Sequence, residues 1–201
     1  MNTLELFAGT QSFSKVVVAD TKITVDILSK FNPTIQADIL TWDYTVYPTG
    51  YFAIIWCSPP CTEYSKAKTR GVRDLELADK CVKRCFEIID YFNPVIWIVE
   101  NPATGLLPTR MDFIRPNLQS YVADYCAYGK PYRKRTMFWC NVPLQLKLCE
   151  GRGKCTQMID RKHKGSCGNG TSIYNEAKIN SVWEKDSIPP GLIQAILDSI
   201  R

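Results

Sequence analysis

The pattern of apolar and polar positions in the first half of the chain predicts strands that alternate with turns and helices. The runs "YFAIIWC" (51–57) and "VIWIV" (95–99) are continuously apolar, which is typical of strands buried on both faces. The run "KITVDI" (22–27) alternates and is rich in β-branched residues, as expected of a strand. A further short apolar run, "TLELFA" (3–8), ends at a turn and leads into the helix-compatible segment "FSKVVVAD" (13–20).

Amphipathic helices are predicted at two places in the rest of the chain. Between residues 73 and 92, apolar side chains recur at the spacing of one helix face. Near the C-terminus, the pair Pro189-Pro190 suits the first turn of a helix, and Asp186 or Ser187 is a candidate cap. The apolar faces consist of Leu77, Cys81, Cys85, Ile88, Ile89 and Phe92 in the first helix, and Leu192, Ile193, Ile196 and Ile200 in the second.

The order of these elements predicts an α/β fold with an open, doubly wound, mostly parallel sheet. The segments "YVADYCAYG" (121–129) and "TMFWCNV" (136–142) are predicted to be strands joined by a tight basic turn, which would add an antiparallel edge. From residue 143 to 185, Gly, Lys, Arg, Cys and Asn replace aliphatic residues, and no periodicity remains. We expect one main domain formed by 1–142 and 186–201, large enough to be catalytic, with a small basic, Cys-rich insertion over 143–185.

Composition supports a single globular domain and indicates in which cellular compartment the protein is expected. With 201 residues, 45% hydrophobic and 22% charged, the chain can bury one sizeable core. No run approaches the roughly 18 to 20 apolar residues that a membrane span needs, so no membrane partner is expected. The N-terminus lacks the pattern of a signal peptide. We therefore expect an intracellular protein of the cytoplasm or nucleus, whose nine cysteines are reduced thiols or metal ligands.

The charge distribution indicates a polyanionic partner that would bind to the second half of the chain. The net charge is +5, and many basic residues fall in "KPYRKRT" (130–136) and "GRGKCTQMIDRKHKG" (151–165). On charge alone, a solvated surface is an equally good interpretation.

Several predicted strands end in residues suited to binding or chemistry. In such folds, ligands bind at the carboxyl ends of the strands, where strand order reverses. Gly9 at a strand-to-helix turn allows a ligand to approach the backbone, and Asp26 is placed to bond the ribose hydroxyls of a nucleoside cofactor. Asp38 could lie near an adenine edge. A plain turn or a helix cap would explain each of these residues as well.

Two further strand ends carry a thiol and a carboxyl group. Cys61 follows Pro59-Pro60 directly after the buried run 51–57, and Glu100 ends the next strand. The prolines fix the backbone, and nearby basic residues could favour the thiolate, as a nucleophile requires. A carboxylic acid on the same rim can donate a proton or a hydrogen bond. A buried structural thiol is the alternative for Cys61.

In this order and spacing, "LELFAGTQSFS", "SPPCTEYS" and "VENP" resemble the cofactor, nucleophile and Glu-Asn-Pro motifs of the DNA (cytosine-5)-methyltransferases. "YGKPYRKRT" resembles the family's later basic motif, and "IPPGLIQAI" resembles its closing helix. The likeness covers most of 1–142 and 186–201, and is greatest to short phage- or virus-encoded forms. The family's second glycine is replaced here, and its long target-reading region is missing.

The resemblance implies methyl transfer from S-adenosylmethionine to carbon 5 of a flipped cytosine in DNA, through a covalent Cys61 adduct. Glu100 would hold or protonate ring nitrogen 3, and Arg133 and Arg135 would contact the base carbonyl and a phosphate. The implied cofactor and base contacts extend to Phe7, Gly9, Thr10, Asp26, Asp38 and Pro59 for the cofactor, and to Ser58, Pro60, Asn101 and Pro102 for the base.

Two other functions remain open from the sequence. The chain could be a catalytically inactive nucleic-acid-binding or regulatory protein on the same fold, or it could methylate cytosine in RNA. Because the target-reading region is short, a second subunit or a homodimer is a candidate for target recognition.

The insertion carries candidate metal ligands. Cys149, Cys155, His163 and Cys167 lie in a segment with almost no apolar residues, and a tetrahedral zinc site would order it. The spacings are not those of a standard zinc finger. A mobile basic loop with incidental thiols is an equally good interpretation. The other cysteines, Cys126 included, lie in predicted strands or on the apolar helix face, where a buried hydrophobic role is favoured.

Overall fold

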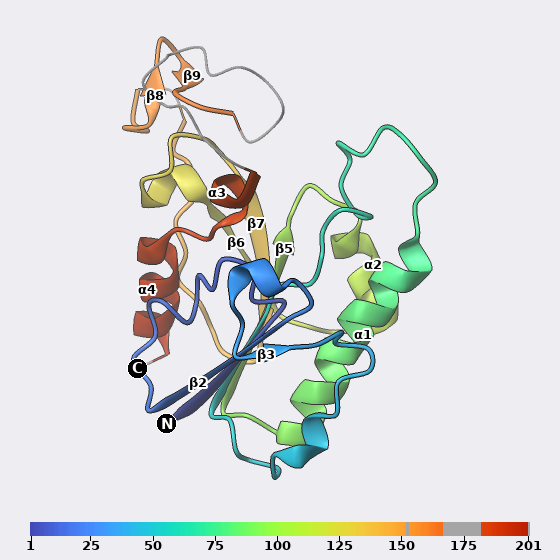
Figure 1. The fold of residues 1–201 in the computed structure, drawn as a ribbon. Helices are drawn as coiled ribbons and strands as arrows, with labels where there is room; N and C mark the ends of the chain where they lie inside the picture. The colour runs from blue at the N-terminus through green and yellow to red at the C-terminus, as the bar shows by residue number, and fades with distance from the viewer. Residues whose placement is uncertain (152, 167–181, 201) are drawn as a thin grey trace.

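The computed structural model describes residues 1–151, 153–166 and 182–200, and a mostly parallel sheet forms its centre (Figure 1). Among the described residues the sheet has seven strands in the order β3-β2-β1-β4-β5-β7-β6. The strands are β1 (Asn2–Leu6), β2 (Thr21–Asp26), β3 (Ile35–Gln36), β4 (Ile54–Cys57), β5 (Ile96–Pro102), β6 (Ser120–Asp124) and β7 (Arg135–Cys140). The predicted α/β fold with a mostly parallel sheet is confirmed.

Strand direction brings the carboxyl ends of most strands to one rim of the sheet. β3, β2, β1, β4 and β5 pair in parallel, in that order. β7 is antiparallel to both β5 and β6, as the basic turn before it predicted. Because β7 runs the other way, its first residues lie at the same rim as the last residues of β5 and β6. In the register, Pro102 pairs with Thr136 and Asp124 pairs with Arg135.

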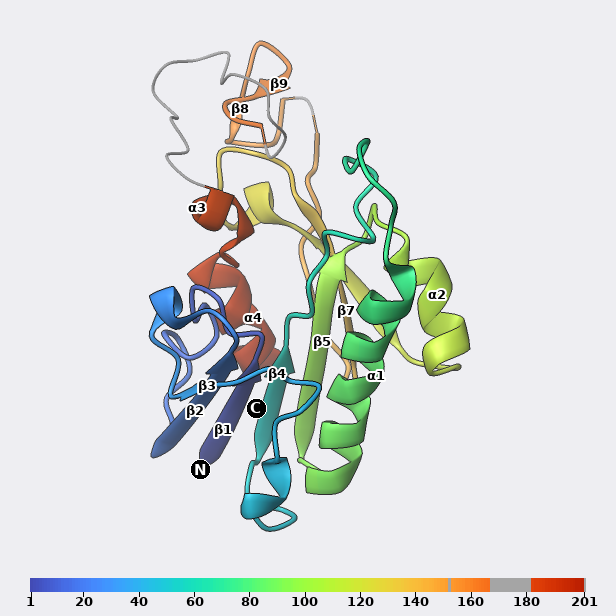
Figure 2. The same cartoon turned by 45° about the vertical axis from the view of Figure 1, so that its right-hand side comes forward.

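Each face of the sheet has its own apolar core. On one face lie α1 (Leu75–Phe92) and α2 (Leu107–Ile114), packed with side chains such as Ile55 and Val99. On the other face lie α4 (Pro190–Ser199) and the segment around Phe13, packed with Trp56 and Ile98. Figure 2 shows the sheet between these two layers. Adjacent residues of β4 and β5 face opposite cores, which explains why their sequences are continuously apolar.

The long helix α1 forms where its apolar spacing predicted it. The Asp74 carboxylate accepts the backbone N–H of Leu77, and Asn93 ends the helix in the left-handed conformation. Val82, Cys85, Ile89 and Phe92 are buried along one side. The helix therefore packs on one face of β4 and β5 and helps to hold these two strands in position.

Three local predictions are wrong, and the first two concern the segments 13–20 and 121–129. Residues 13–16 form turns and residues 17–20 have no regular secondary structure, so no helix forms there. Three consecutive valines, Val16–Val18, lower the helix propensity of this segment. At its start, the buried Glu5 carboxylate accepts the N–H groups of Phe13 and Ser14. The predicted strand 121–129 ends at Asp124, and the 3-10 turn η3 (Tyr125–Tyr128) follows.

The third wrong prediction concerns the cap of the closing helix, α4. Its cap residue is Pro189, which makes no side-chain capping bond. Asp186 instead pairs with Lys134, and the Ser187 hydroxyl donates to the carbonyl of Glu184. No pattern in the sequence indicated α2, whereas the strand end predicted near Asp38 corresponds to the two-residue strand β3.

The described part of the insertion is a small hairpin beyond the rim of the sheet (Figure 1). It pairs β8 (Met158–Ile159) with β9 (Lys162–His163), and the chain returns through α3 (Val182–Asp186). No helix among the described residues is long and apolar enough to cross a membrane. The division into a catalytic domain and an insertion remains a prediction.

We expect Ile193→Ala to lower the free energy of unfolding by about 2–5 kcal/mol, because Ile193 is fully buried between α4 and the sheet. Urea denaturation followed by circular dichroism measures this change. The neighbouring exposed residue provides the control: Gln194→Ala should change the stability by less than about 0.5 kcal/mol. Equal effects of the two substitutions would contradict the packing of α4 described above.

Candidate active site

The loop after β4 and the end of β5 meet at the rim and are joined by a buried amide. Asn101 is 1% exposed, and its Nδ2 donates to the carbonyl of Pro59 at 2.8 Å. Ser58 accepts the indole N–H of Trp56 at 3.1 Å and hydrogen-bonds the Glu100 carboxyl group. The segment Ser58–Cys61 is therefore held against Glu100–Pro102 from both ends, as adjacent parallel strands allow.

Two cavities open on this rim, and Cys61 lines both. The first has a volume of about 350 Å³ and is lined by the loop after β1, by the end of β2 and by Ser58–Thr62. The second has a volume of about 570 Å³ and lies between residues 65–67, residues 102–105 and the start of β7. Both volumes fall in the range of about 300–1,000 Å³ that is typical of ligand sites. The shared lining residues are Cys61, Asn101, Pro102, Lys134 and Asp186.

The first cavity has the features of a nucleoside site. Phe7, Gly9 and Gln11 all have positive φ (55°, 45° and 56°), so the chain after β1 makes a tight left-handed turn. The N–H of Gly9 donates to the Asp26 carboxylate at 2.8 Å, and the same carboxylate accepts the N–H of Leu28. Asp26 thus braces the loop while still lining the cavity.

Gln11 and Ser12 hold the shape of the turn after β1. Gln11 adopts the left-handed conformation itself, and its side-chain amide donates to the carbonyls of Phe31 and Asn32. Ser12 accepts the N–H of Ile188, which fastens the loop to the chain before α4. The positive φ values and these tethers keep the backbone close to the cavity without a second glycine.

Glu5 is a cavity-lining acid that the sequence did not single out. It is 2% exposed, and burial raises its pKa to about 7, although the N–H groups of Ser14 and Phe13 act in the other direction. Its position inside a short strand gave no signal, because it resembled the polar position of an alternating strand.

Most of the residues expected at the cofactor site lie together, and one does not. Asp38 is exposed and is not among the cavity-lining residues; its carboxylate accepts the N–H of Leu40 and closes a turn. The others line the first cavity: Phe7, Gly9, Thr10, Asp26 and Pro59. Of the residues expected at the base, Ser58 and Pro60 line the first cavity, whereas Asn101 and Pro102 line both.

Burial raises the pKa of both candidate reactive groups, the Cys61 thiol and the Glu100 carboxyl group. Burial is the largest cause that raises the pKa of the Cys61 thiol, and the negative charges of Glu100 and Asp186 add to the rise. Burial also raises the pKa of Glu100. In both cases the Lys134 cation acts in the opposite direction. Burial thus acts toward the neutral forms of both groups, and the Lys134 cation acts toward the anion of either one.

Lys134 is the functional candidate that sequence reasoning missed. Its ammonium group lies 3.1 Å from Asp186, and its side chain is 15% exposed. Although burial acts against its charge, the acidic groups around it raise the pKa of Lys134, so it remains a cation. Residues 133 to 135 alternate in direction as they enter β7, and the sequence alone does not tell which of them points into the site.

Arg133 and Arg135 point to the other side of the chain. Both form ion pairs with the buried Asp124, at 3.3 Å and 2.7 Å. They line the second cavity with side chains that are 45% and 36% exposed, and neither is among the residues of the first. The structure thus brings Lys134, and not the two arginines, beside both Cys61 and Glu100.

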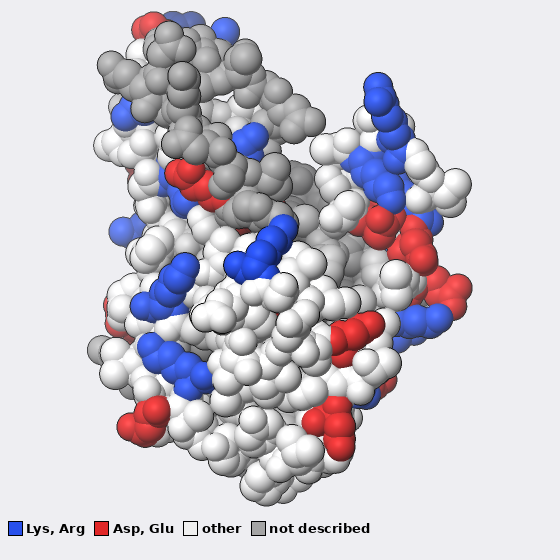
Figure 3. All heavy atoms as spheres, viewed as in Figure 1, with Lys and Arg blue, Asp and Glu red and all other residues white. Residues whose placement is uncertain are grey.

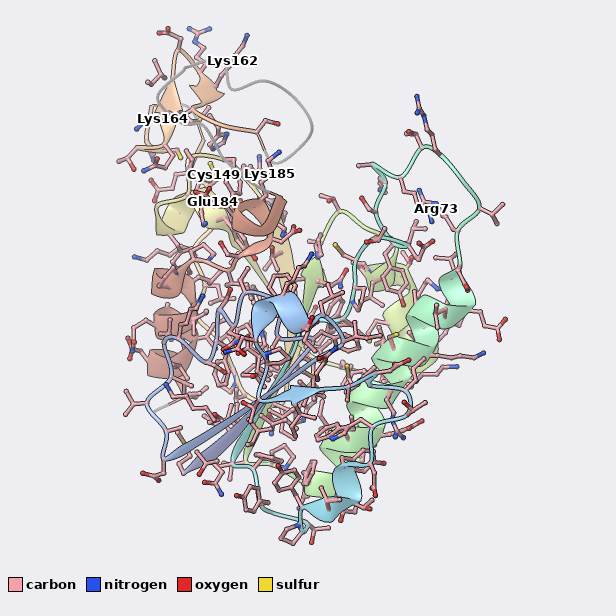
Figure 4. The ribbon with its side chains drawn as sticks, in the orientation of Figure 1. Arg73, Cys149, Lys162, Lys164, Glu184 and Lys185 are labelled. Atoms are coloured by element: carbon pink, nitrogen blue, oxygen red, sulfur yellow. The ribbon has the colours of Figure 1, made fainter. Side chains whose placement is uncertain are left out.

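A basic loop forms the opposite wall of the second cavity. It runs from Thr62 to Arg73, and the Arg73 guanidinium shapes it by donating to the carbonyls of Glu63, Ser65 and Lys68. Lys66 is exposed and lines the cavity. Figure 3 shows blue side chains gathered on this loop and the surface indented beside it. In Figure 4, Arg73 and Lys185 lie on opposite sides of this indentation.

The expected metal ligands converge only in part. Cys149, Cys155 and His163 lie together, and the fourth member of their group is Cys126 from η3. Cys126 is buried, as expected, but it also belongs to a polar cluster. Cys167 lies outside the described residues. All eight described cysteines are free thiols.

Comparison with known proteins identifies a full-length relative. The chain is 36% identical, over 98% of its own length and 99% of the relative's, to the probable DNA (cytosine-5)-methyltransferase of Frog virus 3 (isolate Goorha). No protein-family model matches the sequence.

Solved structures share the fold. The methyltransferase EhMeth of Entamoeba histolytica is 18% identical with a TM-score of 0.52, over 73% of this chain and 56% of that one. A DNMT2 mutant of Spodoptera frugiperda is 16% identical with a TM-score of 0.51, over 74% and 54%. The chain spans about half the length of these two structures, so the likeness is one of fold.

We expect Lys134→Met to slow the alkylation of Cys61 by iodoacetamide, because loss of the cation raises the pKa of the thiol. A rise of one in this pKa lowers the thiolate fraction about tenfold. Peptide mass spectrometry across a pH series measures the rate at Cys61 alone. Lys83→Met, at an exposed position on α1, is the control and should leave the profile unchanged. An unshifted profile in Lys134→Met would show that the lysine does not act on Cys61.

Proposed function

Because this chain belongs to the DNA (cytosine-5)-methyltransferase family, we propose that it methylates carbon 5 of a cytosine that is flipped out of DNA. The methyl donor is S-adenosylmethionine, and Cys61 bonds covalently to the base during the reaction. One observation carries the proposal: Cys61 lies on the common wall of two cavities, with Lys134 and the Glu100 strand end beside it. Donor and acceptor can therefore be bound on either side of one thiol.

The first cavity suits the methyl donor. Asp26 offers a carboxylate at the end of β2 for ribose hydroxyls, and the left-handed turn at Gly9 exposes backbone to a ligand. Phe7, Thr10 and Pro59 complete the walls, whereas Asp38 lies outside them. When bound there, S-adenosylmethionine supplies an electrophilic methyl group.

The cytosine would lie where the two cavities meet at Cys61, with Glu100 on the side of the first cavity, and the adjoining backbone would lie in the second. Its walls carry Lys66 on one side and Arg133 and Arg135 on the other, and these cations can hold phosphates. Asn101 fixes the loop that presents Cys61, so it acts as a positioning residue through the carbonyl of Pro59. Ser58 orients the Glu100 carboxyl group.

The chain's own groups can make carbon 5 nucleophilic. The Cys61 thiolate adds to carbon 6, and a new carbon–sulfur bond replaces the carbon 5–carbon 6 double bond. Glu100, whose pKa burial raises, donates its proton to ring nitrogen 3 as charge develops there. Lys134 stabilises the thiolate before addition and the Glu100 carboxylate after proton transfer. The electron pair is thereby directed to carbon 5.

The adduct is resolved by elimination. Once carbon 5 carries the methyl group, its proton leaves to a water molecule and the electron pair of that bond restores the double bond. Cys61 departs as thiolate, and ring nitrogen 3 returns its proton to Glu100. The enzyme residues therefore end in the protonation states in which they began.

We expect DNA that contains 5-fluorocytosine to form a stable covalent adduct with the chain in the presence of S-adenosylmethionine. Fluorine at carbon 5 cannot leave as a cation, so elimination is blocked. Denaturing electrophoresis detects the adduct, and peptide mass spectrometry locates it. Cys61→Ala should abolish it, whereas Cys81→Ala, which removes a partly buried thiol on α1, should not. An adduct that survives in Cys61→Ala would refute the assignment of the nucleophile.

We expect Glu100→Gln to lower the rate of methyl transfer by about 10²–10⁴-fold, because an amide cannot transfer a proton to the ring. Transfer of labelled methyl groups measures the rate, and calorimetry measures cofactor affinity, which should change little. Glu76→Gln, at an exposed position on α1, is the control. Unaltered turnover in Glu100→Gln would remove Glu100 from the mechanism.

The same assay decides between the proposal and its alternatives. Methyl transfer to duplex DNA supports the proposed substrate, and transfer to RNA alone would contradict it. If the chain binds DNA but does not bind S-adenosylmethionine at about millimolar concentration, it is a nucleic-acid-binding protein on the same fold.

A further inference from the structure

Three cysteines and the only histidine of the chain meet beside the active site, although they come from distant segments. Cys126 lies in η3, Cys149 and Cys155 lie in the segment that follows β7, and His163 lies in β9. Their ligand atoms all lie within 4.8 Å of one another. None of the four takes part in the methyl-transfer mechanism, so the cluster needs its own explanation.

Two nitrogen–sulfur distances in the cluster match the edges of a metal tetrahedron. With Zn–S bonds of about 2.3 Å and Zn–N bonds of about 2.0–2.1 Å, tetrahedral geometry places sulfur and nitrogen about 3.6 Å apart. The Nε2 atom of His163 lies 3.5 Å from Sγ of Cys149 and 3.7 Å from Sγ of Cys155. A disulfide would use only two of the sulfurs and would leave the histidine unexplained.

The surroundings of the cluster lack a core that could otherwise hold it. Among the described residues from 145 to 166, none is buried. Their backbone bonds form a short hairpin, with only a few links to the domain, such as the N–H of Cys149 to Asp124 and the N–H of Gly165 to the carbonyl of Pro131. A segment of this kind needs a cross-link to be ordered. Cys126, which is 3% exposed, supplies the only ligand from the main domain.

We propose that Cys126, Cys149, Cys155 and His163 bind a structural Zn²⁺ ion that fastens the insertion to the wall of the substrate cavity. Three thiolates and an imidazole fill a tetrahedral site, which leaves no open position for catalysis. Such a centre carries a net charge of −1, and the Arg135 cation lies close enough to Cys126 and Cys149 to interact with their charges.

The proposed ion would act on the active site through Asp124. This carboxylate accepts the N–H of Cys149 at 2.9 Å and pairs with Arg135 and Arg133, the residues on either side of Lys134. The zinc site and the turn into β7 therefore share one buried anion. The ion would also hold the hairpin that carries Lys162 and Lys164 above the rim, as Figure 4 shows, where those cations can reach a DNA backbone.

Metal analysis of the purified full chain tests the site directly. We expect about one zinc per chain by inductively coupled plasma mass spectrometry, and cobalt substitution should give the intense visible bands of a tetrahedral thiolate centre. Cys155→Ser and His163→Gln should each lose most of the metal. Cys81→Ser, at a thiol outside the cluster, should retain it. Because Cys126 is buried, its substitution is not needed for the test.

Limited trypsin digestion separates a structural role from accidental binding. Removal of zinc by a chelator should expose residues 154–164 to cleavage, while the core digests no faster and S-adenosylmethionine binding is unchanged. The proposal is overturned if zinc stays far below one per chain after reconstitution, if both variants retain it, if cleavage is unchanged by chelation, or if mass spectrometry finds a disulfide among the three cysteines. None of these outcomes depends on the methyl-transfer mechanism.

Discussion

Parallel pairing of β4 with β5 is the constraint on which the rest of the site depends. Because Cys57 pairs with Val99, the Pro59-Pro60-Cys61 loop and the Glu100-Asn101-Pro102 segment lie side by side at the same rim of the sheet. Asn101 then joins them by one buried hydrogen bond to the carbonyl of Pro59. The two apolar cores hold these strands from both faces, so the rim is built on rigid elements and not on the loops alone. Both cavities are consequences of this arrangement.

The electrostatic interactions at the rim centre on one partly buried cation, Lys134. Burial favours the neutral forms of Cys61 and Glu100, whereas the proposed chemistry needs each to become an anion at a different moment. Lys134 can stabilise both in turn, and Asp186 balances it in the resting state. The arginines on either side are committed to Asp124 and shape the neighbouring wall. A lysine suits this position because it acts as a point charge for two different groups.

The insertion solves a different physical problem. It is too short and too polar to form an apolar core, yet it lies over the rim where a nucleic acid would bind. A metal cross-link would order the insertion with only a few residues, and one of its ligands, Cys126, would come from the domain itself. The shared Asp124 links that order to the turn that carries Lys134. Stability of the insertion and geometry of the active site would then depend on the same contacts.

The sequence by itself determined the parts that follow from local pattern: the buried strands, helix α1, the antiparallel edge, and the order of the motifs around Cys61 and Glu100. Tertiary structure decided the rest, because partners distant in the chain set it. The Glu5 carboxylate holds the N–H groups of Phe13 and Ser14 from a strand earlier in the chain, the direction of residues 133–135 depends on the buried Asp124, and Cys126 lies beside its metal-ligand candidates because β6 and β7 pair. Local spacing contains none of these contacts, since each joins segments whose separation only the folded chain removes.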